Sequence, residues 1–274
     1  MIVSTGMACA ILVGCFLLLV MLRVPVAFAL GLATVPVVVL DLRLTPFILL
    51  DRMFQSYNSF ILLAVPFFLL AANLMNSGKI TDKLINLARV LTGWMPGGLG
   101  HVNVMVSMLF AGISGSSTAD AAGCGKILIP AMKREGFDLR FAVAITACSS
   151  VMGVIIPPSI LMVVWGGVMQ ISVGGLFLAG AIPGLMIGGA LLATVYGYAK
   201  VYGYPISDRP TLASFWVALR GAILALLTPV FVVGGIIGGI VTPTESAIIA
   251  AFYSMILGLF VYRTVSFRQL GEIF

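Results

Sequence analysis

Long apolar runs alternate with short clusters of charged residues along the chain. The apolar runs cover residues 7–22, 24–40, 57–75, 173–199, 222–241 and 247–262. Their lengths are close to, or for 173–199 longer than, the roughly 20 residues that a helix needs to cross about 30 Å of hydrocarbon. They are continuous, unlike the alternating strands of outer-membrane barrels. The pattern predicts an all-α polytopic membrane protein, with a kink at Pro66 inside the run 57–75.

The segment 79–92 has a different pattern, because apolar and charged residues fall on opposite faces of a helix. Its apolar face holds Ile80, Leu84, Leu87, Ala88 and Leu91. Such a helix either lies along the membrane surface or packs as a loop helix on the protein. In both cases we expect an arm rather than a membrane span.

Two further apolar segments are interrupted. Residues 93–132 contain the polar, glycine-rich run 112–120, with the sequence GISGSSTAD, and residues 141–169 are broken by GVIIPPS at 153–159. Unwound backbone inside a membrane is tolerated only where it faces protein, water or a bound ion. We therefore predict a re-entrant hairpin followed by a broken helix, and two such elements point to a binding site near the bilayer midplane.

Composition narrows the class of protein. Of the 274 residues, 61% are hydrophobic and 9% are charged, with a mean hydropathy of +1.18. This excludes a soluble domain, which carries about 25% charged residues. The net charge of +6 comes from basic residues at helix ends, which indicates the positive-inside signal of a membrane protein rather than nucleic-acid binding. If the hairpin leaves the membrane on the side where it enters, all the basic clusters lie on the same side of the membrane. The positive-inside rule makes that side the cytoplasm and places the N-terminus outside.

Few residues have side chains suited to metal or redox chemistry. The cysteines lie inside apolar segments without CxxC spacing, and His101 is the single histidine; the cysteines are Cys9, Cys15, Cys124 and Cys148. We interpret the cysteines as packing residues. The hairpin segment contains one acidic residue, Asp120, and one basic residue, Lys126, apart from those at its ends. An ionisable side chain at membrane depth is a candidate for a functional role. Both could instead lie near the interface or pair with other residues.

The run 114–118 concentrates hydroxyl groups and free carbonyls. These are hard oxygen ligands for an alkali cation, and the adjacent helix N-termini favour an anion. The alternative is that the hydroxyls make interhelical or back-bonded hydrogen bonds. Near the C-terminus, Thr242, Pro243 and Glu245 fit a capping box, which we prefer to a proton-relay role for Glu245.

Several motifs together resemble one family. PGGLGHVNVMVSMLFAGISGSSTADAAG, ILIPAMKREGFD and GVIIPPSI are similar to the large membrane subunit of tripartite ATP-independent periplasmic (TRAP) transporters. LAVPFFLLAANLMNSG and GGIVTPTESAIIAAFY match the same family in the same order. The resemblance implies a sodium-coupled importer of organic acid anions, such as C4-dicarboxylates, sialic acid or sugar acids, in a bacterial inner membrane. It further implies a small membrane subunit and a periplasmic substrate-binding protein as partners.

The resemblance also implies an elevator-type fold with specific domains and ligands. Residues 1–78 would be scaffold helices, 79–92 the arm, 93–170 the hairpin and broken helix of the transport domain, and 171–274 further membrane helices. Sodium would bind mainly through carbonyls at Ser114, Ser117, Gly153, Ile156 and Pro158. The organic acid would lie near Ser116, Thr118 and Ser159.

One feature departs from that family. Its large subunit is longer and holds a second, inverted copy of the hairpin and broken helix, of which we find only a weak echo at residues 239–246. We therefore expect a fragment or truncated product, and a non-transporting subunit is one alternative. Another is a rhomboid-like intramembrane serine protease, because residues 112–115 read GxSG. That enzyme needs a histidine on another helix, whereas His101 lies in the same hairpin segment, so we predict no enzyme.

Overall fold

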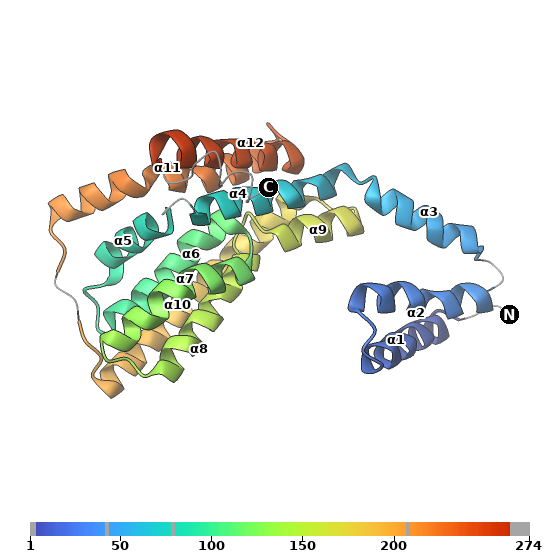
Figure 1. Cartoon of the computed structure of the whole chain (residues 1–274), viewed down its shortest axis with the longest axis horizontal. Coiled ribbons are helices and arrows are strands. Elements are labelled where there is room, and N and C mark those ends of the chain that lie inside the picture. The colour runs from blue at the N-terminus through green and yellow to red at the C-terminus, as the bar shows by residue number, and fades with distance from the viewer. Residues whose placement is uncertain (1–3, 42–43, 78–79, 207–208, 264–274) are drawn as a thin grey trace. The chain divides into compact units, whose positions relative to one another are not determined.

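The computed structural model describes residues 4–41, 44–77, 80–206 and 209–263, and every regular element in these ranges is a helix (Figure 1). The chain divides into two compact units, Met1–Ser59 and Phe60–Phe274. The all-helical architecture confirms the predicted fold class. Each unit is described by itself below.

The first unit consists of α1 (Thr5–Met21), α2 (Val26–Leu40) and α3 (Pro46–Tyr57). Ser4 caps α1 by accepting a hydrogen bond from the Met7 amide at 3.4 Å. Helices α1 and α2 pack against each other after a short turn that includes Arg23 in the left-handed region, at φ 63°. The predicted apolar runs 7–22 and 24–40 therefore coincide with helices to within about two residues.

The second unit contains the interrupted segments. Its elements are η1 (Phe60–Leu63), α4 (Ala64–Ser77), α5 (Ile80–Thr92), α6 (Gly98–Ser114), α7 (Ser117–Arg134), α8 (Leu139–Ser150), η2 (Val151–Val154), α9 (Ile160–Met169), α10 (Val173–Tyr202), α11 (Leu212–Ile237), α12 (Pro243–Ile256) and η3 (Leu257–Val261). The kink predicted at Pro66 is wrong. Helix α4 begins at Ala64, so Pro66 lies in its first turn, where a missing amide proton breaks no helical hydrogen bond.

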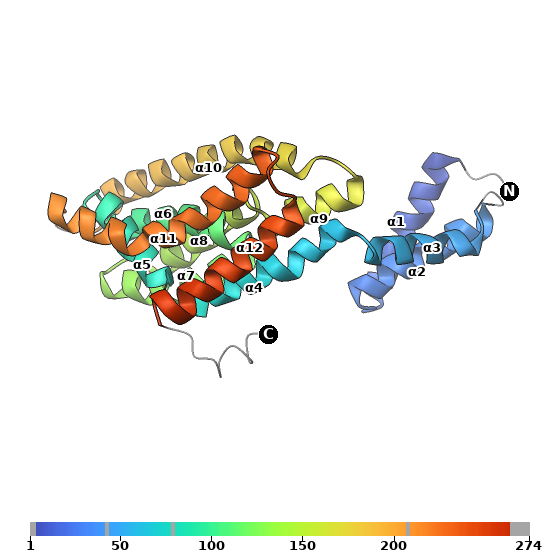
Figure 2. The same ribbon diagram turned by 90° about the horizontal axis from the view of Figure 1, so that it is seen from above.

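Helix α6 lies at the centre of this unit. It packs against α5, α7, α8, α10 and α11, and Figure 1 shows α6, α7 and α8 side by side. Its residues Leu99, Val102, Val106 and Phe110 are almost fully buried. On another side of the unit, α12 runs along α4, as Figure 2 shows from above. The hairpin formed by α6 and α7 therefore packs against helices that precede it in the sequence and against helices that follow it.

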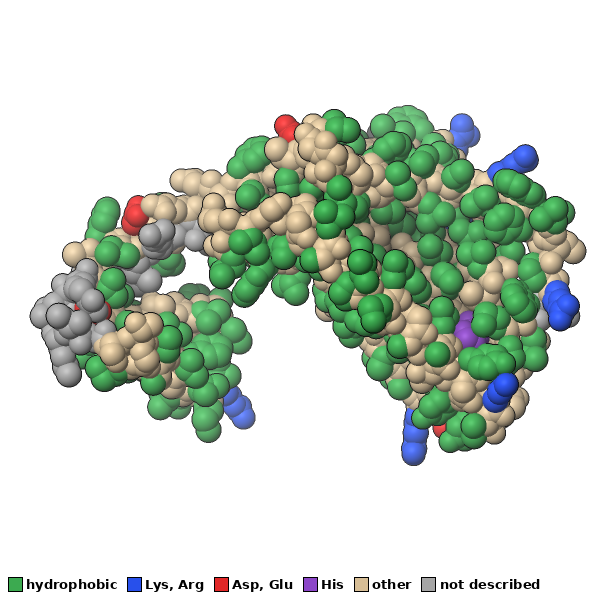
Figure 3. All heavy atoms as spheres, turned by 180° about the vertical axis from the view of Figure 1, so that it is seen from behind, with side chains coloured by type: hydrophobic (Ala, Val, Ile, Leu, Met, Phe, Trp, Pro, Cys, Tyr) green, Lys and Arg blue, Asp and Glu red, His purple; other side chains and the backbone are tan. Residues whose placement is uncertain are grey.

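Three described helices are long and apolar enough to cross a membrane: α10, α11 and the stretch Pro243–Val261. The stretch Phe60–Asn76, which includes η1 and most of α4, passes the same test only together with α5, as a pair bent by 71°. The outer face of α10 exposes large apolar side chains such as Leu178, Ile182 and Met186. Hydrophobic side chains likewise cover much of the face of this unit shown in Figure 3. A surface of this kind matches lipid rather than water.

The predicted amphipathic arm is α5. Ile80, Leu84, Leu87 and Ala88 are buried, while Leu91 is 38% exposed. The buried face packs against α6 and α11, and the charged residues of α5 point outward. Of the two alternatives left open by the sequence, the structure supports a helix whose apolar face packs on the protein.

Candidate functional site

The tip of the hairpin is a two-residue break between α6 and α7. Gly115 ends α6 in the left-handed conformation, with φ 62°, and its amide donates to Ala111 O. Ser116 then caps α7: its Oγ accepts from the Ala119 amide at 3.3 Å and lies 3.0 Å from the Thr118 hydroxyl. The glycine allows the reversal, and the serine satisfies a free amide at the new helix start.

The second break separates α8 from α9. After η2 the chain passes through Pro157 and Pro158, which are joined by a cis peptide bond, and Ser159 caps α9. The Ser159 hydroxyl donates to Val154 O at 2.8 Å and accepts from the Met162 amide at 3.3 Å. A second helix N-terminus is thereby formed.

The two breaks meet through main-chain atoms. The Ile160 amide donates to Gly115 O at 3.2 Å. A Cβ atom added at Gly115 would lie 2.9 Å from Pro158 O, and one added at Gly153 would lie 3.0 Å from Ser116 O and from Ser117 N. A side chain at Gly115 would be strained by the positive φ and the close Pro158 O, and one at Gly153 would force the Ser116–Ser117 peptide to shift. The capped starts of α7 and α9 consequently lie at one place, which we call the tip junction (residues 114–118 and 153–160).

The tip junction brings together most of the residues predicted to hold sodium. Ser114 is buried, and its Oγ accepts from the Ser116 amide at 3.4 Å. Gly153 lies against the Ser116–Ser117 peptide, and the carbonyl oxygen of Pro158 lies against Gly115. Ile156 lies differently: its side chain rests against Gly184 of α10, and its amide donates to Met152 O. Ile156 could therefore contribute its carbonyl oxygen alone.

The residues predicted to contact the organic acid differ in exposure. Ser116 is half-buried and Thr118 is exposed, so both hydroxyls are accessible from the same end of α7. Ser159 is fully buried, and its hydroxyl proton already goes to Val154 O. Ser159 thus acts in this structure as a helix cap. The ligand assignments themselves stay predictions.

A polar network between α6 and α8 was missed by the sequence reasoning. Asn103 Nδ2 donates to Thr146 Oγ1 at 2.7 Å, Ser149 Oγ donates to Asn103 Oδ1 at 3.3 Å, and Ser107 Oγ donates to Ser149 Oγ at 3.0 Å. All four residues are buried. The sequence does contain a pattern that could have predicted it. Polar residues recur three or four positions apart inside apolar segments, at 103 and 107 and at 146 and 149, and so share one helix face. The network joins the hairpin to the broken helix.

The two ionisable residues of the hairpin, Lys126 and Asp120, lie in different environments. Lys126 is exposed, whereas Asp120 is fully buried, and neither of its oxygens has a hydrogen-bond partner. The ring nitrogens of His101 likewise have none, so the described residues contain no hydrogen-bonded pair of His101 with a hairpin serine. The described residues also contain no group of three or more His, Cys, Asp or Glu side chains that could hold a metal ion.

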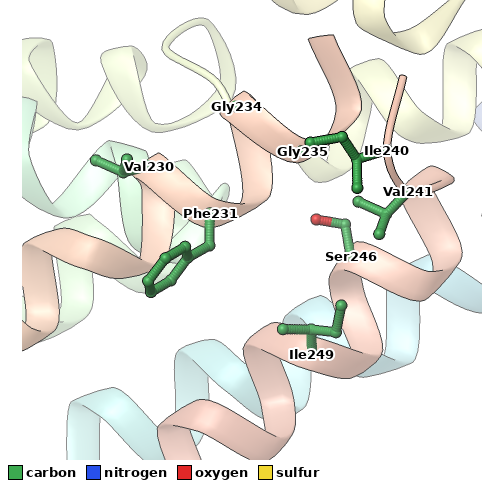
Figure 4. Close-up of a pocket in the computed structure, with 8 residues that line it drawn as sticks. All are labelled: Val230, Phe231, Gly234, Gly235, Ile240, Val241, Ser246 and Ile249. Atoms are coloured by element: carbon green, nitrogen blue, oxygen red, sulfur yellow. The ribbon is translucent and has the colours of Figure 1, made fainter. Parts of the chain in front are cut away.

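Helices α11 and α12 contribute two further features outside the tip junction, a capping box and a cavity. Thr242 and Glu245 form the predicted capping box, with both reciprocal hydrogen bonds present. A cavity of about 370 Å³ lies beside it, lined almost entirely by apolar side chains such as Phe231, Ile240 and Ile249 (Figure 4). The hydroxyl of Ser246, which lines the same cavity, donates to Val232 O at 3.3 Å. This cavity does not offer the polar groups that an organic anion needs.

Comparison with known proteins identifies the family. Residues 13–274 match the sequence profile described as "Tripartite ATP-independent periplasmic transporter, DctM component". The chain belongs to the DctM family. This is a family of transporter permeases, not of enzymes, and its members are integral proteins of the bacterial inner membrane.

Curated relatives of this family are similar over most of the chain. The sialic acid TRAP transporter permease protein SiaT of Haemophilus influenzae is 41% identical over 271 residues, which is 97% of this chain and 43% of that protein. The large permease SiaM of Vibrio cholerae is 43% identical over 81% of this chain and 52% of its own length. The C4-dicarboxylate permease DctM of Rhodobacter capsulatus is 34% identical over 97% and 64%. The chain spans about half the length of the curated relatives it matches.

Proposed function

We propose that this chain forms part of a permease that imports an organic acid anion together with sodium. The observation that carries the proposal is the tip junction, where the N-termini of α7 and α9 meet through direct main-chain contacts. Discontinuous helices of this kind bind substrates and coupling ions in secondary transporters. The DctM family supplies the transport class.

Sodium is the coupling ion that suits the available donor atoms. We propose the main-chain carbonyls of Ser114, Ser117, Gly153, Ile156 and Pro158 as its ligands, and residues 114–118 and 153–160 include no cysteine or methionine as a soft ligand. Carbonyl and hydroxyl oxygens suit hard cations. A cation held there would also neutralise an anion bound at the adjacent helix starts.

The substrate would bind through its acid group at the start of α7. Helix N-termini carry free amides and a partial positive charge that favour anions, and the hydroxyls of Ser116 and Thr118 are accessible. The names of the relatives include sialic acid, C4-dicarboxylate, isethionate and 2,3-diketo-L-gulonate. An acid group is common to these compounds, so we propose an organic acid anion as the substrate class.

We further propose the partners and motion of the family for this chain. A small membrane subunit would complete the permease, and a periplasmic binding protein would deliver the substrate. The hairpin and broken helix would move as an elevator against the scaffold. Helix α5, which packs on α6 and α11, would connect moving and static parts.

Uptake in proteoliposomes tests sodium coupling. The permease should contain this chain within its full-length subunit and be combined with the small subunit and the binding protein. A labelled organic acid should accumulate under an inward sodium gradient and not under an equal potassium gradient. Equal uptake with both cations would refute the coupling.

A pair of variants tests the ligand assignment. Ser114→Ala combined with Ser117→Ala should raise the sodium concentration that gives half-maximal uptake. The matched control is Thr194→Ala on α10, whose hydroxyl is exposed and bonded to Ala190 O within its own helix. Unchanged sodium affinity in the double variant would reject the two serine hydroxyls as ligands, while the main-chain carbonyls, which alanine retains, would be tested by Gly153→Ala.

A further inference from the structure

The carboxyl group of Asp120 lies behind the tip junction, between α6, α7 and α8. Asp120 is the fourth residue of α7, and its amide donates to Ser116 O at 3.1 Å. Its side chain lies beside those of Ser107, Ser150 and Cys124. The residue is fully buried, and neither carboxyl oxygen receives a hydrogen bond. A buried acid without donors calls for a physical explanation.

The two neighbouring hydroxyl groups have already used their protons. Ser107 Oγ donates to Ser149 Oγ at 3.0 Å, and Ser150 Oγ donates to Thr146 O at 2.7 Å. The direction of the first bond is fixed further along the network. There the Thr146 hydroxyl donates to Ala142 O and Asn103 Nδ2 donates to Thr146 Oγ1. The Ser149 hydroxyl donates to Asn103 Oδ1 at 3.3 Å or to Thr146 O at 3.1 Å, and in both cases away from Ser107. Each hydroxyl has one hydrogen, so Ser107 and Ser150 present only lone pairs toward Asp120.

An ionised carboxylate in this position would face two serine oxygens that act as acceptors, and the donor beside it in the described structure is the Cys124 thiol, which is a weak one. Burying such a charge is costly. The neutral acid, in contrast, carries an O–H group that can donate to Ser107 Oγ or Ser150 Oγ. The surroundings are therefore complementary to the protonated form of Asp120.

Other charges do not offset this arrangement in the described structure. Helices α6 and α8 bring Ser107 and Ser150 to the site, and η2 and the Asn76 end of α4 also pack near α7. The titratable side chain that interacts with Asp120 is Cys124 on α7 itself. No described lysine, arginine, histidine or second carboxylate interacts with Asp120.

We propose that Asp120, Ser107 and Ser150 form a proton-binding site in the hairpin. One proton is held on a carboxyl oxygen of Asp120 and is shared with a serine oxygen. An alkali ion suits this site less well, because the carboxyl and hydroxyl oxygens are few and the remaining neighbour, the Cys124 thiol, is a soft ligand. The site is distinct from the carbonyl ligands proposed for sodium, so it stands or falls independently of sodium coupling.

Infrared spectroscopy of the 274-residue chain in lipid nanodiscs tests the proposal. The wild type at neutral pH should show a carboxylic acid C=O band that moves in D₂O and on ¹³C labelling of aspartate. Asp120→Asn should lose this band. The matched control is Asp41→Asn, which removes a buried acid from the first unit and should retain the band.

Ser107→Ala and Ser150→Ala provide a second readout that does not depend on folding of the Asp120 variant. Loss of the acceptor that receives the acid proton should move the C=O band to higher frequency in at least one of them. Absence of an acid band in the wild type would overturn the proposal, as would loss of the band in Asp41→Asn. A carboxylate band of Asp120 that shifts between sodium and potassium would also overturn it and assign an alkali ion instead.

Discussion

Gly153→Ala is the most direct test of the tip junction. The added Cβ would lie 3.0 Å from the carbon and oxygen of Ser116 and from the nitrogen of Ser117. These are backbone atoms, which cannot rotate away as a flexible side chain can. Ordinary carbon contacts lie at about 3.5–4.0 Å, so the hairpin tip must move by roughly half an ångström or more.

The expected change in the free energy of unfolding for Gly153→Ala is the difference between two opposing effects. Overpacking costs about 1–3 kcal/mol, whereas replacing glycine by alanine stabilises by about 0.4–1 kcal/mol through the unfolded chain. The expected net destabilisation is therefore roughly 0–2.5 kcal/mol. The same change at Gly189 on α10, where nothing lies within 4 Å of the added Cβ, should stabilise the helix by about 0.5–1 kcal/mol. The two variants thus make the same chemical change with opposite expected signs.

The assay is reversible unfolding of the purified chain in mixed micelles, with sodium or potassium chloride. A ligand that binds only the folded state at ten times its Kd adds about 1.4 kcal/mol of stability. Sodium should supply this increment to the wild type and to Gly189→Ala but not to Gly153→Ala, because the displaced Ser116–Ser117 peptide belongs to the proposed site. Equal stability of the two variants would refute the packing argument. An unchanged sodium increment in Gly153→Ala would refute the placement of the ion.

Three further predictions use the same unfolding measurement. Asn103→Ala should destabilise the chain by about 1–3 kcal/mol, because it removes the donor to Thr146 and an acceptor of Ser149. Ser116→Ala should cost about 0.5–2 kcal/mol through loss of the α7 cap, and it should also weaken uptake of the organic acid. Thr242→Ala should cost a similar amount at the α12 capping box, about 0.5–2 kcal/mol, without altering sodium dependence.

Each of these three predictions has its own contradicting result. Wild-type stability of Asn103→Ala would mean that the α6–α8 network contributes nothing. Normal uptake by a destabilised Ser116→Ala would restrict that serine to capping. A changed sodium response in Thr242→Ala would connect α12 to the ion site, in contrast to the separation proposed here.

The sequence predicted the elements better than their contacts. The breaks at Gly115–Ser116 and Pro157–Pro158 could be predicted because glycine, proline and hydroxyl residues interrupt apolar helices by local chemistry. The Thr242 capping box is likewise local, since it spans the four residues from Thr242 to Glu245. The apolar face of α5 could be predicted from periodicity, but its packing against α6 and α11 depended on tertiary structure.

The site was predictable only in part for the same reason. That Gly153 contacts the Ser116–Ser117 peptide depends on how two segments about 36 residues apart in sequence come together, and no local pattern encodes this. Ser159 was predicted to contact substrate, yet its hydroxyl is used within its own turn. Ile156 faces α10, because the unwound stretch before the prolines turns its side chain toward Gly184.

The close approach of Gly115 to Pro158 also bears on how this region tolerates substitution. A site lined by peptide groups keeps its ligands whatever side chains are attached, provided that the backbone path is preserved. Alanine scanning of the neighbouring serines would therefore underestimate its importance. Replacing Gly115 and Gly153, which carry no side chain to remove, should disturb it most.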